Sequence, residues 1–172
     1  MDLGSMVCTP RNPRCDVCPW QGACKALTSG CPEQFPRKAA RKPKPMRQGY
    51  VFWLTDNHDQ VYLRRRPEKG LLGGMVEFPS TAWQEDTLDS AEITAQAPTD
   101  GVVWELVEGT VTHTFTHFHL QLAVLQGRLK KADAVGNGYW CRPEDFHQLV
   151  LPTVMKKVAA HVAGSRKRDQ SG

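Results

Sequence analysis

The alternation of hydrophobic and polar residues divides the chain into four stretches. Residues 1–35 are rich in Cys and Pro and have little periodic apolar pattern, so they cannot bury a core of their own. Residues 36–47 mix basic residues with prolines, which disfavour helix and keep the chain extended and solvated. From residue 48 onward, β-favouring runs and helical periodicity appear. The pattern predicts a small N-terminal module, a linker over 36–47, a folded domain over 48–164 and a disordered tail over 165–172.

Short runs in the first half of the folded domain predict strands. The runs 50–54 and 61–63 flank the polar cluster 56–59, an arrangement typical of a β-hairpin. A glycine-containing loop over 71–79 is expected to lead back to a strand. A longer β region is expected over 102–125, where alternation is clearest from His113 to Leu122.

The end of the domain carries helical signals. Pro143 opens a short helical segment that reaches Leu149, and Pro152 suits the first turn of a second helix. Apolar residues then recur at helical spacing, at Val154, Val158 and Val162. The fold class is therefore predicted to be α+β, with a largely antiparallel sheet and flanking helices.

Composition and charge exclude some classes of protein for this chain and favour others. Hydrophobic residues make up 40% of the 172 residues, which argues against global disorder, and the net charge of +4 mildly favours an anionic partner. No apolar run approaches the ~20 residues that a bilayer span needs, and the N-terminus lacks the apolar core of a signal peptide. We therefore expect no membrane partner and a cytoplasmic location, associated with the nucleoid in a bacterium. In a reducing compartment, clustered thiols are more typical of metal sites than of disulfides.

Four cysteines form a candidate metal site. Cys8, Cys15, Cys18 and Cys24 have six, two and five residues between them, which gives four soft ligands in a short span. Four thiolates suit an iron-sulfur cluster or a zinc ion, and the spacing alone leaves both open. The first interval contains Arg11 and Arg14, which are candidates for contacts with phosphates.

The residues around these cysteines carry a resemblance to a known family. The segments that match are Met1 to Gly4, Val7 to Pro10, Pro13 to Cys15, and Cys18 with Pro19. Together they resemble the cluster loop of MutY-type adenine DNA glycosylases. The resemblance implies one 4Fe-4S cluster held by Cys8, Cys15, Cys18 and Cys24, which is structural and faces DNA. It also implies that residues 1–35 are the remnant of a helix-hairpin-helix glycosylase domain.

A second segment, Lys69–Pro79, resembles the Nudix-like C-terminal domain of the same glycosylases. The resemblance implies a Nudix-like fold with a mainly antiparallel or mixed sheet and flanking helices. Nudix hydrolases also need a downstream helix whose carboxylates gather divalent cations around a diphosphate. Residues 80–100 contain only scattered acidic residues, so pyrophosphohydrolase activity is the less favoured alternative.

The stretch from His113 to Leu120 resembles the family's loop that inspects the oxidised base opposite adenine. The family pattern is Phe-Ser-His, and this chain has Phe115, Thr116 and His117. 8-Oxoguanine carries an N–H group at N7, where guanine has an acceptor, and a hydroxyl oxygen can accept a hydrogen bond from that N–H. Phe115 is expected to stack on or wedge between bases, and His117 to donate to a base edge or a phosphate.

Two other interpretations of this stretch stay open. On a regular strand, His113, His117 and His119 would point to one face and form a zinc site. Alternatively, Phe115 and Phe118 are core residues beside a partly solvated row of histidines. At the level of the whole chain, the alternative is a non-catalytic zinc-binding or protein-interaction module.

The resemblance also defines what this chain lacks. The family removes adenine with a glutamate and an aspartate that lie upstream of the cluster loop, so no residue is assigned a catalytic role here. We expect the C-terminal portion of a base-excision-repair adenine DNA glycosylase, inactive alone. Its expected partners are double-stranded DNA containing 8-oxoguanine opposite adenine and a separate catalytic domain.

Overall fold

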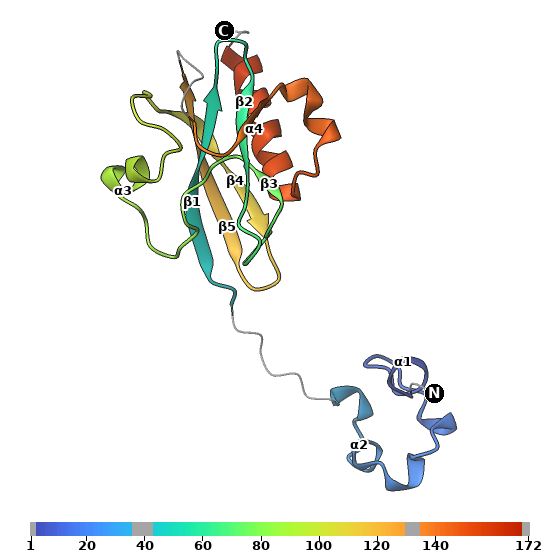
Figure 1. The fold of residues 1–172 in the computed structure, drawn as a ribbon. Helices are drawn as coiled ribbons and strands as arrows, with labels where there is room; N and C mark the ends of the chain where they lie inside the picture. Colours follow the sequence, from blue (N-terminus) through green and yellow to red (C-terminus); the bar gives the residue numbers. More distant parts are fainter. Residues whose placement is uncertain (1–2, 36–42, 130–134, 170–172) are drawn as a thin grey trace. The chain divides into compact units, whose positions relative to one another are not determined.

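The computed structural model describes residues 3–35, 43–129 and 135–169, and it divides the chain into two compact units. The first unit is Met1–Pro43 and the second is Lys44–Gly172. Each unit is described by itself (Figure 1). Most of the predicted linker, residues 36–42, lies outside the described residues.

The first unit consists of short helical turns joined by loops. None is longer than four residues, as expected for a segment that lacks a periodic apolar pattern. In chain order they are α1 (Leu3–Met6), η1 (Cys15–Val17), η2 (Gln21–Ala23), α2 (Lys25–Thr28) and η3 (Pro32–Gln34).

The second unit is built on one mixed sheet with the strand order β3-β2-β1-β5-β4, in which β6 also pairs with β2. The central pair, β1 and β5, is parallel, and the other pairs are antiparallel. The strands are β1 (Met46–Thr55), β2 (Val61–Arg65), β3 (Val76–Glu77), β4 (Glu105–Thr114), β5 (His119–Arg128) and β6 (Tyr139–Cys141).

The predicted hairpin over 50–63 is present as β1 and β2, in which Thr55 pairs with Val61. The buried side chain of Asp56 organises its turn, because one carboxylate oxygen accepts from the backbone N–H groups of His58 and Gln60, each at 2.8 Å. Asp59 adopts a positive φ of 58° in the same turn. The local turn chemistry thus fixes where β1 ends and β2 begins.

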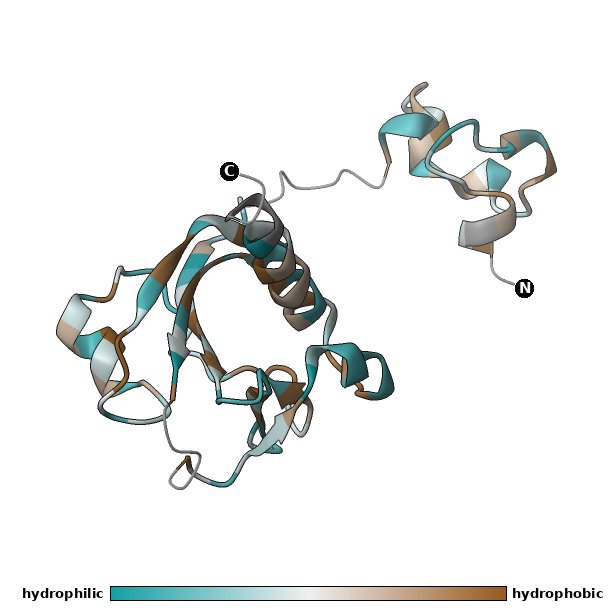
Figure 2. Cartoon of the chain, turned by 90° about the horizontal axis from the view of Figure 1, so that it is seen from above, coloured by the Kyte–Doolittle hydropathy of each residue, from teal (hydrophilic) through white to brown (hydrophobic). Residues whose placement is uncertain are grey.

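The described residues of the second unit also form three helical segments. The predicted helical segments near the end of the domain are η4 (Pro143–Gln148) and α4 (Thr153–Asp169). The third, α3 (Ser90–Ala95), was not predicted, although Asp89 and Glu92 form a capping box at its start. Figures 1 and 2 show α3 and α4 on opposite sides of the sheet.

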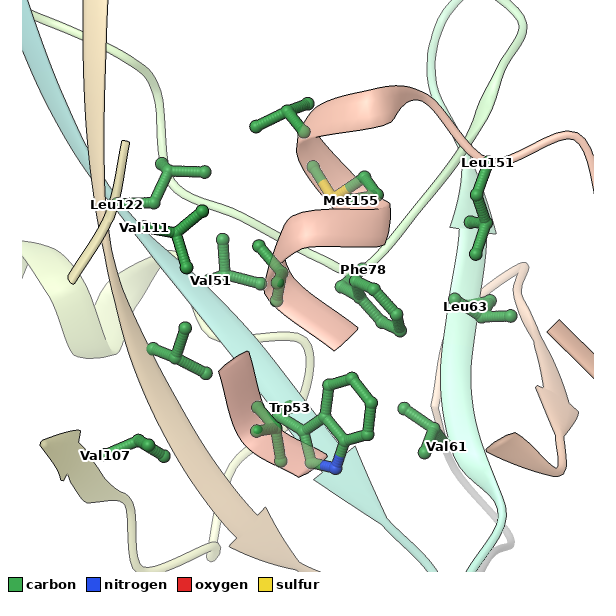
Figure 3. Close-up of a cluster of buried hydrophobic side chains, with 14 of the residues drawn as sticks. Val51, Trp53, Val61, Leu63, Phe78, Val107, Val111, Leu122, Leu151 and Met155 are labelled. Carbon is green, nitrogen blue, oxygen red and sulfur yellow. The ribbon is translucent and has the colours of Figure 1, made fainter. Parts of the chain in front are cut away.

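The main core lies between the sheet and α4. Successive residues of β1 point to opposite faces, so Val51 and Trp53 join this core while Leu54 joins a smaller cluster on the other face. In Figure 3, Trp53 and Phe78 lie close together, with Met155 of α4 nearby; the Trp53 and Phe78 ring centroids are 4.8 Å apart. Figure 2 shows hydrophobic and hydrophilic residues interspersed along α4 and the strands.

The structure corrects several predicted boundaries. β1 begins at Met46, inside the predicted linker, because its first residues pair with β5 from His119 onward. The β region predicted over 102–125 is two antiparallel strands with a turn at 115–118. α4 continues to Asp169, so the helix includes residues that were predicted to be a disordered tail. Among the residues described, no helix has the length and apolarity that a bilayer span requires.

Candidate functional site

The backbone of the first unit brings the four candidate ligand cysteines around one space. The loop after Cys8 closes where the Arg14 N–H donates to the Val7 carbonyl at 2.9 Å. The next turn closes where the Cys18 N–H donates to the Cys15 carbonyl at 3.3 Å. Short turns, rather than long elements, therefore set the positions of the thiols.

These four cysteines line a single cavity of about 330 Å³. Its other walls are mainly apolar and include Leu27, Pro32 and Phe35. Apolar walls with four thiols suit an iron-sulfur cluster, whose Cys ligands are spread around a multi-atom core. Among the described residues, no three Cys, His or acidic side chains converge as ligands of one metal ion. The space between the four thiols and its apolar lining fit a 4Fe-4S cluster.

The electrostatics of the site agree with this geometry. Desolvation raises the pKa of the Cys15 thiol above its ordinary value, and the neighbouring thiols, Cys24 first among them, raise it further. Neighbouring thiols of this kind are stabilised as thiolates once a cationic metal centre binds them. Cys15 thus interacts with the other three proposed ligands.

The other residues singled out near the cysteines separate into two groups. Arg14 lines the cavity, whereas Arg11 is exposed and is not part of its wall. Cys31 is exposed outside the cavity, and Cys141 belongs to β6 in the second unit. The cavity is therefore lined by the four cysteines of the motif and by neither of the remaining two.

The residues predicted to read the lesion form the turn of the β4–β5 hairpin. The Phe115 N–H donates to the Phe118 carbonyl at 2.9 Å, which closes the turn. Thr116 and His117 are exposed at its tip, whereas Phe115 is half-buried and Phe118 is buried. The turn thus presents two polar side chains to solvent above the two phenylalanine rings.

Aromatic contacts fix the two ends of this turn. The Phe115 ring lies 4.8 Å from the Phe118 ring and 4.6 Å from the His113 ring, measured between centroids. The Arg47 guanidinium carbon lies 4.6 Å from the centroid of the Phe118 ring, within the range of a cation–π contact. The two phenylalanines therefore serve as packing residues and as part of the candidate site.

The row of histidines predicted on one strand face does not exist. The chain reverses direction between β4 and β5, so His113 and His119 lie on different strands and His117 is in the turn. His119 Nδ1 lies 2.9 Å from the Thr114 hydroxyl instead. The three-histidine zinc site is therefore wrong, because it assumed one continuous strand. Desolvation lowers the pKa of His113, and the nearby Lys157 ammonium lowers it further.

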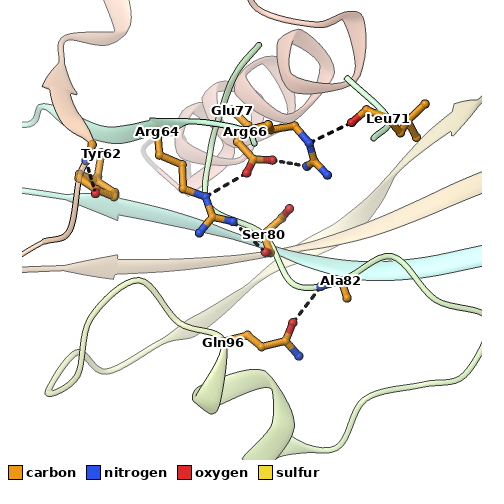
Figure 4. A network of polar contacts seen from close by, with 9 residues as sticks. Tyr62, Arg64, Arg66, Leu71, Glu77, Ser80, Ala82 and Gln96 are labelled. Carbon is orange, nitrogen blue, oxygen red and sulfur yellow. Dashed lines mark hydrogen bonds and ion pairs between the residues drawn. The ribbon is translucent and has the colours of Figure 1, made fainter. Parts of the chain in front are cut away.

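The acidic residues of the second unit do not form a cation-binding array. Glu77, which is only 1% exposed, is instead held by Arg64 and Arg66 (Figure 4). The Arg64 Nε donates to one carboxylate oxygen at 2.9 Å, and Arg66 donates to the other. Within the described ranges, no three acidic or other ligand side chains gather to bind a metal ion. These contacts give no support to a pyrophosphohydrolase site.

Besides Arg47, sequence reasoning missed Lys44, Trp83 and Arg66, which lie at or next to the candidate site. The Lys44 ammonium donates to the Phe115 carbonyl at 2.9 Å, although Lys44 was assigned to the linker. The Trp83 ring lies 5.9 Å from the Phe115 ring, and the Arg66 guanidinium carbon lies 4.9 Å from the Trp83 ring centroid. The mixture of Lys and Arg with aromatic residues was visible in the sequence, but their proximity depends on the tertiary fold.

Two family models match the chain, one in each of its two units. Residues 50–161 match the model described as the NUDIX domain. Residues 8–24 match the model described as the iron-sulfur binding domain of endonuclease III. The second match begins and ends at the first and last cysteines of the motif.

Similar proteins include several adenine DNA glycosylases. The human protein of that name is 28% identical over 220 residues, which cover 92% of this chain and 39% of that protein. The mouse protein is 28% identical over 223 residues, which cover 97% of this chain and 43% of that protein. This chain therefore spans about two fifths of the length of these two curated relatives.

Solved structures show the same fold for the second unit. The C-terminal domain of mouse MUTYH, solved in complex with human PCNA, has a TM-score of 0.55 and 23% identity, covering 70% of this chain and 90% of that chain. The MutT protein from Methanosarcina mazei has a TM-score of 0.59 and 13% identity, covering 75% of this chain and 99% of that chain. These matches confirm the predicted fold class, the iron-sulfur motif and the resemblance to adenine DNA glycosylases.

Proposed function

The chain belongs to the NUDIX domain family, and on that premise we propose that it is the lesion-reading C-terminal portion of an adenine DNA glycosylase. Its ligand is double-stranded DNA that contains 8-oxoguanine opposite adenine. The chain spans 39% of the human relative, and the part that it spans contains the hairpin that we assign to recognition. Adenine excision requires a partner catalytic domain, and no residue described here is assigned to that reaction.

The exposed tip of the β4–β5 hairpin is the observation that carries this proposal. Thr116 and His117 are exposed there, while Phe115 and Phe118 anchor the turn below them. Guanine offers an acceptor at N7, whereas 8-oxoguanine offers a proton there, so a hydroxyl acceptor distinguishes the two bases. The Thr116 hydroxyl is assigned to that contact, and His117 to a base edge or phosphate.

Basic residues at the base of the hairpin support DNA as the partner. The Lys44 ammonium is 2.9 Å from the Phe115 carbonyl, and Lys157 donates to the Thr112 carbonyl at 2.8 Å. Arg47 packs over Phe118 nearby. Cationic side chains beside a reading loop attract the phosphate backbone and give the affinity on which base discrimination depends.

The first unit contributes a second set of DNA contacts. Cys8, Cys15, Cys18 and Cys24 would hold a 4Fe-4S cluster in the 330 Å³ cavity that they line. When bound, the cluster supplies rigid covalent cross-links to a segment that has few long elements. The loop between the first two ligands presents Arg11 and Arg14 to phosphates, and these contacts position the DNA without reading its sequence.

A fluorescence-anisotropy titration tests the reading function. The chain is titrated against matched duplexes with 8-oxoguanine or guanine opposite adenine, at one fixed salt concentration, because salt alone changes affinity steeply. One specific base contact contributes roughly 1–3 kcal/mol, so we expect an affinity ratio of about ten or more in favour of 8-oxoguanine. Thr116→Val keeps the size of the side chain and removes the hydroxyl, and it should bring the ratio close to one.

Thr112→Val is the matched control, because Thr112 is also exposed on β4 but lies away from the hairpin tip. This variant should keep the ratio of the unmodified chain. Phe115→Ala should lower the ratio by removing the ring that supports the tip. Equal affinity of the unmodified chain for the two duplexes would overturn the proposal and leave a basic DNA-binding fragment.

A further inference from the structure

Trp83 lies against the reading hairpin without belonging to it. Its ring is 5.9 Å from the Phe115 ring, with an angle of 31° between the ring planes. Phe115 in turn contacts Phe118, with ring centroids 4.8 Å apart. A continuous set of aromatic contacts therefore extends from Trp83 to both ends of the turn that presents Thr116.

The backbone around Trp83 is fixed to the central strand. Gln48 and Gln84 exchange two backbone hydrogen bonds, of 2.7 and 3.1 Å, and the Thr81 N–H donates to the Tyr50 carbonyl at 2.9 Å. Gly49 lies between these attachments on β1. A Cβ added at Gly49 would be 2.8 Å from Cδ1 of Trp83, so the absent side chain is what lets the indole pack against the strand.

Arg66 anchors the indole from the buried polar network. Its guanidinium carbon is 4.9 Å from the centroid of the Trp83 ring. The same guanidinium group donates to the Leu71 carbonyl at 3.1 Å and to the buried carboxylate of Glu77 (Figure 4). Because Arg66 is held at two other points, it has little freedom to move away from the ring.

The indole N–H of Trp83 shows whether this residue acts through a hydrogen bond or through its ring. Buried Trp side chains usually find a hydrogen-bond acceptor for Nε1. In the part of the chain that the structure describes, the buried Trp83 Nε1 has none. The contact between Trp83 and the hairpin is therefore a contact between rings and not a hydrogen bond through Nε1. A phenyl ring should supply most of the same support.

We propose that Trp83 is a positioning residue for lesion reading, which holds Phe115 and so fixes the tip that carries Thr116; this inference rests on the proposed function. A contact that discriminates two bases must be held in its binding geometry before the DNA arrives, because ordering a loose turn reduces the net affinity. Trp83 connects that turn to β1 and to the Glu77–Arg66 pair.

Three substitutions in the full chain test this role. Trp83→Leu removes the aromatic ring, Trp83→Phe keeps one, and Trp104→Leu is the matched control in the smaller cluster on the other face of the sheet. The measured quantity is the affinity ratio for the duplexes with 8-oxoguanine and guanine opposite adenine. Because one base contact is worth about tenfold or more, Trp83→Leu should bring the ratio close to one while weak binding to both duplexes persists. Trp83→Phe and Trp104→Leu should keep the ratio.

A spectroscopic measurement keeps the test valid if Trp83→Leu does not fold. The unmodified chain is labelled with 5-fluorotryptophan, and the fluorine resonance that disappears in Trp83→Phe is assigned to Trp83. We expect this resonance to shift more with the 8-oxoguanine duplex than with the guanine duplex, and the Trp104 resonance to shift with neither.

Two results would overturn the positioning role while leaving the proposed function intact. One is a folded Trp83→Leu variant that retains the affinity ratio of the unmodified chain. The other is a Trp83 resonance that responds equally to the two duplexes although the affinities differ. Equal affinity of the unmodified chain for both duplexes would instead overturn the proposed function, and this inference with it.

Discussion

The Glu77 carboxylate is predicted to be the most sensitive polar group of the second unit. It is 1% exposed and pairs with Arg64 and Arg66, whose side chains are 40% and 23% exposed. Glu77→Gln keeps the shape but leaves two guanidinium groups without their counter-charge. Removing one partner of a buried pair costs roughly 3–5 kcal/mol, and because Arg64 reaches solvent we expect about 3 kcal/mol.

Urea unfolding followed by tryptophan fluorescence measures this cost, since Trp53 is buried in the main core. With a slope of about 2 kcal/mol per molar urea, the transition midpoint should fall by roughly 1.5 M. Asp59→Asn is the matched control, because Asp59 pairs with Arg128 while both side chains are largely exposed. That change should cost less than about 1 kcal/mol. A midpoint shift for Glu77→Gln no larger than that for Asp59→Asn would refute the reasoning.

Three further predictions concern the cluster, the pH dependence and the hairpin tip. Cys18→Ser should lose the visible iron-sulfur absorption, whereas Cys31→Ser should keep roughly four iron atoms per chain; equal iron content in the two variants would contradict the ligand assignment. The lowered pKa of His113 means that the unfolded state binds more protons below pH 6.5. The free energy of unfolding should therefore fall as the pH drops below that value, and less steeply in His113→Gln, in urea titrations at several pH values. Thr116→Ser keeps the hydroxyl, so its affinity ratio should match or exceed that of the unmodified chain, and a ratio near one would argue against the hydroxyl contact.

Local patterns predicted much of the second unit. The hairpin at β1 and β2 followed from the polar cluster that begins at Asp56, whose carboxylate does bind the turn backbone. The last helix followed from Val154, Val158 and Val162, all of which are buried in the main core. Both signals depend on residues that are close in the sequence.

Features that depend on distant residues were missed. The parallel pairing of β1 with β5 joins Met46 to His119, and no local pattern encodes that register. The turn at 115–118 has no Gly, Pro, Asn or Asp, so two antiparallel strands were interpreted as one alternating region. The capping box of α3, in contrast, was visible at Asp89 and Glu92 and could have predicted that helix.

The candidate site shows the same difference between features that are local in the sequence and features that depend on distant residues. The spacing of the four cysteines is local, so their shared cavity could be anticipated from the sequence. Trp83 is more than thirty residues from Phe115 in the sequence, and its contact with the hairpin exists only in the folded sheet. The candidate ligand and reading residues were therefore easier to find than the residues that pack around them.

The decisive measurement follows the backbone amide signals of an isotopically labelled chain during addition of each duplex. We expect the 8-oxoguanine duplex to shift the amides of residues 115–118 more strongly than the guanine duplex. Amides next to phosphate contacts, which the two duplexes share, should respond equally to both. Equal shifts at 115–118 with the two duplexes, or a lesion-dependent response confined to another part of the chain, would contradict the assignment of the hairpin as the reader.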